Sequence, residues 1–387
     1  MATIRKRTWV NTEGEQKSAF LVDYLAREAD GSRRRRTKQF EFRRDAEAFR
    51  IRVDSDLQVG KVVPSRKQTV DDTVGNWIKG REAAKRERST IDQYNQHRKH
   101  IRAVIGHVKL IDLTAQHVEK LRDDLLQDAS PAMARKVLVS LRSAIRSARL
   151  GHNVAADVKV ETDKRGRKKL KAGVDFPTTA EVAAIIGATS GKSRALLMVA
   201  AFAGLRASEI RGLRWRDIDL KNDTITVEQR ADRYAAIGNP KSKDSHRTVP
   251  VGPRVVAALR EWKVECPKNS GDLAFPTSEG NVDHHKNVTA YILHPSEIRA
   301  RVAVQIGRDS EGRPIFAPKY TGLHMLRHFY ASWCLARPPA GIGLTLKETS
   351  ERLGHASIVL TADTYGHLLP DANDAKALAD AETRILG

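Results

Sequence analysis

Six side chains spread over the second half of the chain could together carry out chemistry on a phosphodiester. They are Arg206, Lys241, His324, Arg327, His355 and Tyr365. Arginine offers a planar fork of donors that matches the non-bridging oxygens of a phosphate. A tyrosine hydroxyl titrates near ~10, so it attacks phosphorus only where neighbouring cations stabilise the phenolate. We therefore expect these residues to form one site in which Tyr365 is the nucleophile.

Each arginine has a potential helper three residues away. Arg206 precedes Glu209 and Arg327 follows His324, and on a helix this spacing places two side chains on the same face. Glu209 can orient the first arginine. Arg327 can supply the second fork, which would stabilise the extra charge on a pentacovalent phosphorus.

The histidines of this region have different expected roles. His324 can accept a proton from the attacking tyrosine. His328, one helical turn later, could suggest a metal pair, but no third ligand follows at a fitting spacing, so we interpret it as structural. His355 lies ten residues before Tyr365 and is a further candidate for a phosphate contact.

A lysine is needed to protonate the departing oxygen. Lys241 lies in a predicted turn between two strands, from which a lysine can reach a substrate groove, and Lys243 is a close rival for this role. The segment 187–193 resembles a phosphate-binding loop, but it is one residue short between its glycines and follows a predicted helix. It therefore does not indicate an ATP site.

The overall charge favours a polyanionic partner. The 387 residues carry a net charge of +21 and the isoelectric point is near 10.1, which is typical of proteins that bind nucleic acid. A membrane partner finds no support, because the sequence has no long uncharged apolar run and no signal or lipidation motif. Cys266 and Cys334 form neither a disulfide framework nor a metal cluster and are expected to be free thiols.

The pattern along the chain predicts a mainly α protein with small β elements and several domains. Residues 1–62 have the pattern of three strands (3–10, 19–26, 34–42) followed by a helix at 43–57. Residues 66–155 have the pattern of a helical bundle with helices at 70–84, 90–105, 115–126 and 131–149. Residues 156–174 are expected to be a basic linker, and 175–387 a mixed, mostly helical domain that carries the chemistry. Candidate contacts to DNA are Arg33, Arg34, Arg35, Arg36, Lys168 and Lys169.

Within the last domain the elements predicted are mostly helices. The capping box Thr178-Thr-Ala-Glu181 opens a helix at 179–187, and 195–203 is apolar enough for a buried helix. Further helices are expected at 255–263, 319–335, 346–353 and 374–386, with strands at 224–228 and 247–251.

Four sequence words carry a resemblance to a known family. They are Gly-Leu-Arg-Ala-Ser-Glu-Ile-Arg-Gly-Leu-Arg-Trp-Arg-Asp-Ile-Asp (204–219), Lys-Ser-Lys-Asp-Ser-His-Arg-Thr-Val-Pro-Val (241–251), His-Met-Leu-Arg-His (324–328) and Leu-Gly-His-Ala-Ser-Ile-Val-Leu-Thr-Ala-Asp-Thr-Tyr-Gly-His (353–367). In this order they resemble the tyrosine recombinases of phages and integrative elements. The resemblance covers 175–370; the 66–152 segment looks like the family's core-binding domain, and the first 60 residues like its arm-type DNA-binding domain.

The resemblance implies a role for each site residue. Tyr365 would be the nucleophile, Arg206 and Arg327 the phosphate clamp supported by Glu209, Lys241 the general acid, His324 the proton acceptor and His355 a further phosphate or leaving-group contact. Met325 departs from the Asp that members often carry there. The family needs no metal, ATP or other cofactor, since the bond energy is kept in a 3′-phosphotyrosine, and strands are exchanged through a four-way junction.

The resemblance also implies partners and a place of action. The partners are double-stranded DNA attachment sites, DNA-bending proteins and directionality proteins. The chain would form a homotetramer on DNA in which carboxy-terminal segments (here 368–387) pass between neighbours. The place of action would be the nucleoid in the cytoplasm of a bacterial host. Alternatives are a type IB topoisomerase-like enzyme that relaxes supercoils, a catalytically silent DNA-binding regulator, and a metal-dependent nuclease or transposase. A metal-dependent nuclease or transposase would need a cluster of carboxylates to hold its metal ions.

Overall fold

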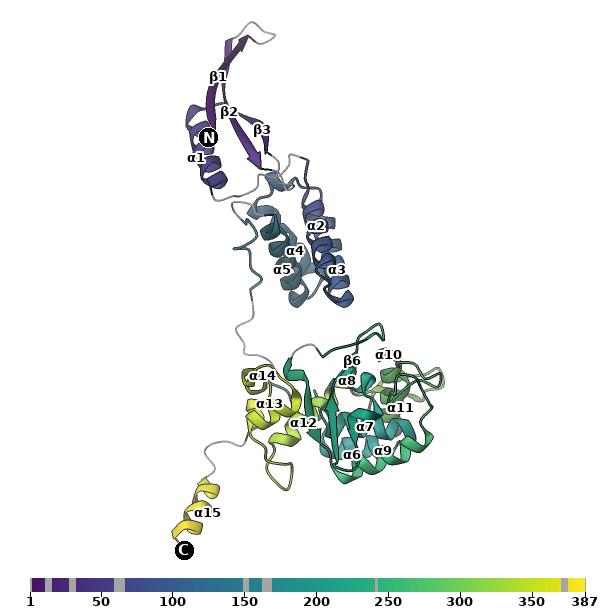
Figure 1. Ribbon diagram of the computed structural model, residues 1–387. Helices are drawn as coiled ribbons and strands as arrows, with labels where there is room; N and C mark the ends of the chain where they lie inside the picture. Colours follow the sequence, from purple (N-terminus) through teal and green to yellow (C-terminus); the bar gives the residue numbers. More distant parts are fainter. Residues whose placement is uncertain are drawn as a thin grey trace. The chain divides into compact units, whose positions relative to one another are not determined.

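The amino-terminal residues of the computed structural model form an antiparallel sheet of order β1-β2-β3, covered by one helix (Figure 1). The strands are β1 (Thr3–Val10), β2 (Gln16–Arg27) and β3 (Arg33–Phe40), and the helix is α1 (Arg43–Gln58). Val22, Tyr24, Ala46 and Val53 form its small core. The three strands and the helix predicted here are confirmed to within a few residues.

The structure describes residues 2–10, 16–27, 33–58, 67–148, 153–161, 169–240, 243–369 and 375–386. The chain divides into two compact units, residues 1–165 and 166–387. Among the described residues, no helix is both long enough and apolar enough to cross a membrane.

In the described part of the first unit, four α-helices follow the sheet: α2 (Val70–Ala83), α3 (Arg88–Ile105), α4 (Ala115–Asp128) and α5 (Pro131–Ser147). Their starts are encoded locally. Thr69 and Asp72 form a capping box before α2, and Ser130 caps α5 with Pro131 at the first helical position. Val158 and Val160, at the start of the predicted linker, pack into the core of this bundle.

The second unit is built around α7 (Gly191–Phe202), which is buried over most of its surface. It packs against α6 (Thr179–Gly187), α9 (Pro253–Glu265) and α12 (His324–Leu335). The capping box predicted before α6 is present, with Glu181 N–H donating to Thr178 Oγ1. The buried helix predicted at 195–203 corresponds to α7, the centre of this core.

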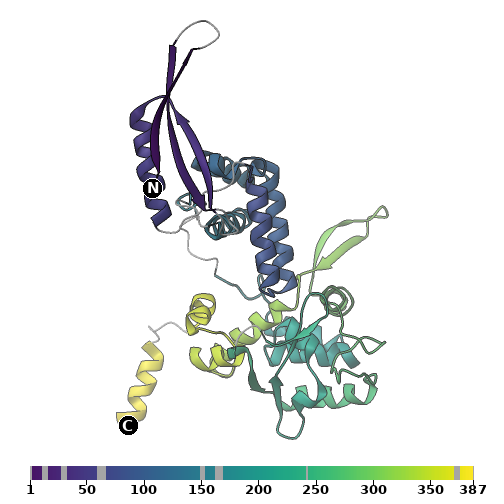
Figure 2. The ribbon, with the colours of Figure 1, turned by 45° about the horizontal axis from the view of Figure 1, so that its top comes forward.

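Small sheets connect these helices. One has the order β4-β5-β8, formed by β4 (Ile218–Asp219), β5 (Thr224–Val227) and β8 (Arg247–Pro250), and β6 (Arg230–Ala231) pairs with β7 (Ile237–Gly238). The helix α8 (Ala207–Gly212) precedes them, and α10 (His285–Asn287), a π-helical turn (Val288–Leu293) and α11 (His294–Arg299) follow. The hairpin of β9 (Ala303–Arg308) and β10 (Pro314–Pro318), which was not predicted, extends from the body of this unit (Figure 2).

The carboxy-terminal helices are α13 (Leu346–Leu353), α14 (Ile358–Tyr365) and α15 (Ala375–Leu386). The sequence predicted α13 and α15 but not α14. The helix predicted at 319–335 begins only at His324, because side chains hold the preceding residues in a different conformation. Lys319 Nζ and Tyr320 Oη both donate to the Glu181 carboxylate, and the Tyr320 N–H donates to Glu297.

Candidate active site

The first arginine stands at the beginning of α8, where the chain turns sharply after α7. Gly204 has a φ of +62°, and a Cβ there would lie 2.2 Å from the Tyr330 ring, so only glycine fits this turn. Arg206 then caps α8. Its backbone N–H donates to Glu209 Oε2 at 2.9 Å, and its guanidinium donates to Glu209 Oε1 at 2.7 Å.

Glu209 is almost completely buried, with 2% of its surface exposed, and it joins two arginines. Besides Arg206, it accepts from Arg247 Nη2 at 2.9 Å. Burial opposes the ionisation of Glu209, but the charges and hydrogen bonds of Arg247 and Arg206 outweigh it and lower its pKa. Glu209 is therefore a carboxylate that fixes both guanidinium groups, as the sequence predicted for Arg206 alone.

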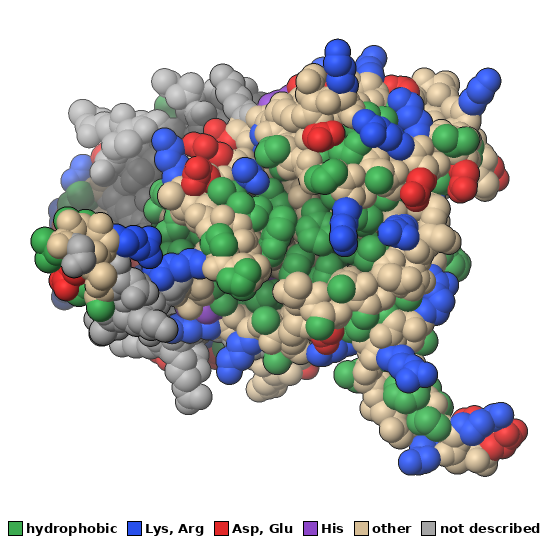
Figure 3. Space-filling view, turned by 90° about the horizontal axis from the view of Figure 1, so that it is seen from below, with side chains coloured by type: hydrophobic (Ala, Val, Ile, Leu, Met, Phe, Trp, Pro, Cys, Tyr) green, Lys and Arg blue, Asp and Glu red, His purple; other side chains and the backbone are tan. Residues whose placement is uncertain are grey.

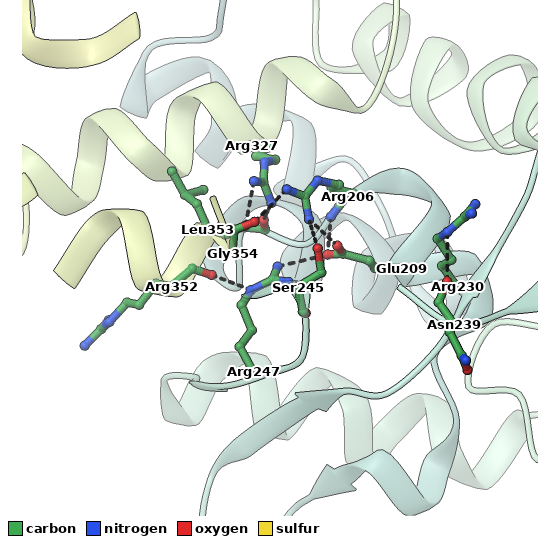
Figure 4. A network of polar contacts seen from close by, with 11 residues as sticks. Arg206, Glu209, Arg230, Asn239, Ser245, Arg247, Arg327, Arg352, Leu353 and Gly354 are labelled. Carbon is green, nitrogen blue, oxygen red and sulfur yellow. Dashed lines mark hydrogen bonds and ion pairs between the residues drawn. The ribbon is translucent and has the colours of Figure 1, made fainter. Parts of the chain in front are cut away.

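The second arginine of the predicted pair reaches the same place from α12. Arg327 donates to the carbonyl oxygens of Gly204 and Leu353, both at 2.6 Å, while Arg206 donates to the carbonyl of Gly354 at 2.8 Å (Figure 4). Gly354 ends α13 in the left-handed region, with a φ of +64°. In addition to the Glu209 carboxylate that binds Arg206, backbone carbonyls at two glycine turns thus hold the arginines.

This arrangement leaves the centre positively charged. Burial and the neighbouring charge of Arg206 lower the pKa of Arg327 to about 9, which still leaves it protonated at neutral pH. Arg206 is partly open to solvent, with 33% of its side chain exposed, whereas Arg327 is 2% exposed. A bound anion would relieve the repulsion between the two guanidinium groups.

Tyr365 lies at the end of α14 with only 2% of its surface exposed. Its hydroxyl oxygen is 2.7 Å from Nδ1 of His328. Burial raises the pKa of Tyr365 to about 12, and the charge of Arg327 acts in the opposite direction. Tyr365 is therefore a neutral phenol beside the arginine centre, and a base has to take its proton before it can act as a nucleophile.

Two further histidines line the site. The His324 ring meets the His328 ring edge to face at 4.6 Å, and His355 Nδ1 is 2.8 Å from Thr361 Oγ1. Burial, with help from the nearby arginines, lowers the pKa of His324 and that of His355 to about 4. Both rings are therefore uncharged at neutral pH.

Most of the predicted set comes together, with two differences. The structure pairs the Tyr365 hydroxyl with His328, for which the sequence predicts only a structural role, and not with His324, the proton acceptor implied by the resemblance. Lys241 lies outside the described residues, as does the side chain of Lys243. Their turn ends at the site, since Ser245 Oγ lies 3.3 Å from Arg206 Nη1.

Sequence reasoning missed one residue of the centre, Arg247. Its side chain is 6% exposed and, besides Glu209, it donates to the carbonyls of Ser245 and Arg352. The signal available was its position in the word 241–251, at the start of a strand whose alternate residues face the core.

The predicted DNA contacts outside this site are only partly described. Lys168 and the side chains of Arg33 and Arg34 lie outside the described residues. Arg35 is exposed and lies 3.7 Å from Asp23, and Lys169 is also exposed. Across the described parts of the chain, no group of three or more His, Cys, Asp or Glu side chains is arranged to hold a metal ion.

Comparison with known proteins agrees with this geometry. The model of the Phage integrase family matches residues 176–371, which are 196 of the 387 residues. The chain is 24% identical to a Tyrosine recombinase XerC-like protein of Caldanaerobacter subterraneus, over 89% of this chain and 91% of that protein. It is 32% identical to the ICEBs1 integrase of Bacillus subtilis, but there it spans about half of each protein, 47% of this chain and 46% of the relative.

Solved structures show the same fold. The Tn1549 transposon integrase, in complex with transposon right end DNA, superposes with a TM-score of 0.64 at 17% identity and covers 83% of this chain and all of that chain. A lambda integrase dimer bound to a core site gives a TM-score of 0.54, also at 17% identity, over 79% of this chain and 97% of that chain. Because the family model matches half of its length, the chain belongs to the phage integrase family of tyrosine recombinases. These enzymes break and rejoin DNA strands.

Proposed function

We propose that this chain is the site-specific recombinase of a phage or integrative element, with Tyr365 as its nucleophile. The observation that carries the proposal is the convergence of Arg206 and Arg327 from different helices beside a buried tyrosine whose hydroxyl is hydrogen-bonded to a histidine. Among the described side chains, Arg206, Arg247 and Arg327 surround a single carboxylate, that of Glu209, and the excess of positive charge favours an anion such as a DNA phosphate.

In the proposed reaction each residue acts on the scissile phosphate. Arg206 and Arg327 hold its non-bridging oxygens, and Tyr365 attacks phosphorus to form a 3′-phosphotyrosine. Lys241, or Lys243 from the same turn, protonates the departing 5′ oxygen. His324 and His355, both neutral, contact the phosphate or the leaving group. The freed 5′ hydroxyl then attacks the phosphotyrosine of a partner strand.

The proposed substrate is a pair of double-stranded attachment sites, bound by the three parts predicted from the sequence. Residues 1–62 would bind arm-type DNA, 66–155 the core site, and 175–387 would cut it, with 156–174 as a linker. Support comes from the net charge of +21 and from the solved integrases of similar fold, which include a lambda integrase tetramer bound to a Holliday junction. DNA-bending and directionality proteins would act with it on the bacterial nucleoid.

The proposed homotetramer would be joined by the carboxy-terminal helix. In α15, Leu378, Ile385 and Leu386 are 63–82% exposed, and Leu378 and Ile385 are seven residues apart, so they lie on one face. A groove of about 910 Å³ between α6, α7 and α9 offers an apolar floor that includes Met198, Phe202 and Trp333. Hydrophobic side chains gather in a hollow on this face, with basic side chains around it (Figure 3). Insertion of α15 from a neighbouring copy would cover both surfaces.

The test of the function is covalent trapping. A site is first selected by binding from a random duplex library and is then remade with a nick close to the cut, so that cleavage releases a short fragment and cannot reverse. We expect the wild-type chain to give a protein–DNA adduct in the presence of EDTA, and Tyr365→Phe to give none. An adduct with Tyr365→Phe would refute the assignment. Relaxation of supercoiled DNA of any sequence would instead favour the topoisomerase-like activity.

The assembly has a test of its own. Leu378→Asp, with Ile385→Asp, should leave cleavage of a single half-site intact and abolish four-way junctions, because a charge cannot enter an apolar groove. The control is Thr383→Asp, which adds one of the two negative charges to α15 at a position that hydrogen-bonds within the helix. Equal junction yields from these variants would contradict the docking of α15.

A further inference from the structure

The Tyr365 hydroxyl has one described hydrogen-bond partner, and it is a residue to which the chemistry above gives no role. His328 Nδ1 lies 2.7 Å from the hydroxyl oxygen. We propose that His328 is the residue that orients the Tyr365 hydroxyl and takes its proton when the tyrosine attacks the phosphate. This inference rests on the proposed function, because it needs Tyr365 to be the nucleophile.

The position of His328 on α12 supports this role. His328 directly follows Arg327, so one turn of helix carries both the phosphate clamp and the group that holds the nucleophile. The Tyr365 ring lies 5.7 Å from the His328 ring, centroid to centroid, and comes from a different helix, α14. A phosphate held by Arg327 would therefore lie close to an already oriented hydroxyl, as a near-attack geometry requires.

The protonation state of His328 also fits. Burial first, and then the charge of Arg327, lower its pKa, while the negative charge of Asp175 acts in the opposite direction. The groups that face it are His324 and Arg327 on its own helix, Tyr365 on α14 and Asp175 from the segment before α6. Since the ring is neutral at neutral pH, Nδ1 can accept the phenol O–H while Nε2 carries the ring proton.

The proton balance is then complete. The Tyr365 O–H bond breaks and its proton moves to His328 Nδ1, while the oxygen forms a bond to phosphorus. The bond between phosphorus and the 5′ oxygen breaks, and that oxygen takes a proton from the lysine of the 241–243 turn. When a 5′ hydroxyl later attacks the phosphotyrosine, its proton returns to the lysine that was deprotonated in the first step, and His328 returns its own proton to the leaving tyrosine oxygen.

His324 and His328 consequently divide the work that the sequence gave to His324 alone. His324 is one turn nearer the amino terminus of α12, and after burial the charges of His328, Arg327 and Arg206 lower its pKa. Its ring lies against the His328 ring rather than against the tyrosine. His324 therefore faces the phosphate clamp, and His328 faces the nucleophile.

The experiment compares two suicide duplexes with the full-length chain. One has an ordinary 5′ oxygen at the cut, and the other has sulfur there, which leaves without protonation. His328→Phe keeps a flat aromatic ring, slightly larger than the imidazole, but removes the acceptor, and should slow adduct formation by about 10²–10⁴-fold on both duplexes. Lys241→Ala or Lys243→Ala removes the acid that protonates the leaving oxygen. The variant that lacks this acid should recover the wild-type rate of adduct formation on the sulfur duplex only.

The pH profile separates proton transfer from packing. His328→Asn keeps an acceptor near the place of Nδ1 but cannot carry a proton away. In both His328 variants the cleavage rate should rise in proportion to hydroxide concentration, because solvent base replaces the imidazole. The wild-type rate should instead level off above the His328 pKa. DNA affinity should stay at the wild-type level in both variants.

A matched control is His97→Asn. His97 is also buried and has Nδ1 2.8 Å from a hydroxyl, that of Ser140, but it lies in the α3–α5 core. Its pH profile should keep the wild-type shape. A wild-type rate for His328→Phe would overturn the proposal, and so would recovery of this variant on the sulfur duplex. Survival of the adduct in Tyr365→Phe would instead refute the proposed function itself.

Discussion

Replacing Glu209 with glutamine tests whether one buried carboxylate keeps the arginine centre together. Glu209 accepts three hydrogen bonds, from the Arg206 backbone, the Arg206 guanidinium and Arg247, at 2.7–2.9 Å. Removing one partner from a buried ion pair costs about 3–5 kcal/mol, because the remaining charge is left uncompensated. In Glu209→Gln, the guanidinium groups of Arg206 and Arg247 lose their counter-charge. The amide N–H₂ of the new side chain also faces one N–H donor, with which it cannot form a hydrogen bond.

The expected loss is about 3–5 kcal/mol in the free energy of local opening around α8 and β8. Hydrogen exchange of peptides from these elements at neutral pH measures it directly, which matters because a chain of several domains need not unfold in one step. Cleavage should fall by about 10²–10³-fold, the usual effect of misplacing one donor to a transition-state oxygen.

The pH dependence gives a second readout. The folded pKa of Glu209 is lowered, so its contribution is present above its unfolded pKa of about 4.3 and is lost as pH falls through the folded value. Glu209→Gln should lose this part of the acid sensitivity.

Asp217→Asn provides the control. Arg214 and Asp217 have the same spacing in sequence, are similarly buried and form two hydrogen bonds at 2.6 and 2.8 Å, away from the arginine centre. This variant should lose stability but keep its cleavage rate. If Glu209→Gln changed local stability by less than about 1 kcal/mol, or if both variants lost cleavage equally, the reasoning would be wrong.

Three further predictions follow from the geometry of the site. Gly354→Ala should reduce stability and cleavage together, because its φ is +64° and the new Cβ would lie 2.9 Å from Arg247 Nη1. The control is Gly312→Ala, which has a φ of +77° but open space around it. This control adds backbone strain without a clash and should keep its activity in the trapping assay. Acid should destabilise the second unit as pH falls from about 6.5 to 4. In this range His355 binds a proton in the unfolded chain but not in the folded chain, where its pKa is about 4. The free energy of unfolding of His355→Asn, measured by denaturation, should therefore depend less on pH in this range. DNA affinity, measured by fluorescence anisotropy, should fall by about 10³-fold or more between 50 and 200 mM salt, as expected for six or more phosphate contacts, and a smaller loss would indicate fewer contacts.

Local features of the fold could be predicted because they depend on neighbours in the sequence. The capping box at Thr178 and the proline after Ser130 fix where two helices begin. The start of α12 could not be predicted, since apolar periodicity extends back to Lys319 while Glu181 and Glu297, far away in the chain, hold that segment out of the helix. Tertiary contacts override a periodic pattern here.

The same distinction separates the site residues that were predicted from those that were not. Arg206 with Glu209, and His324 with Arg327, are detectable because a spacing of three defines one helix face. His328 and Arg247 have partners 37 and 38 residues away in sequence, Tyr365 and Glu209. A spacing of that size indicates nothing about contact, so only the fold shows which histidine meets the tyrosine.

The way the arginines are held explains why the centre suits a phosphate. Among the described side chains, Arg206, Arg247 and Arg327 share a single carboxylate, that of Glu209, and the histidines around them have lowered pKa values. Their other described bonds go to the Ser245 hydroxyl and to backbone carbonyls, which orient a guanidinium without cancelling its charge. Had carboxylates stood at Gly204 and Leu353, the arginines would be equally rigid but neutralised. Carbonyl anchors at two glycine turns give the rigidity and leave about two positive charges for the substrate to neutralise.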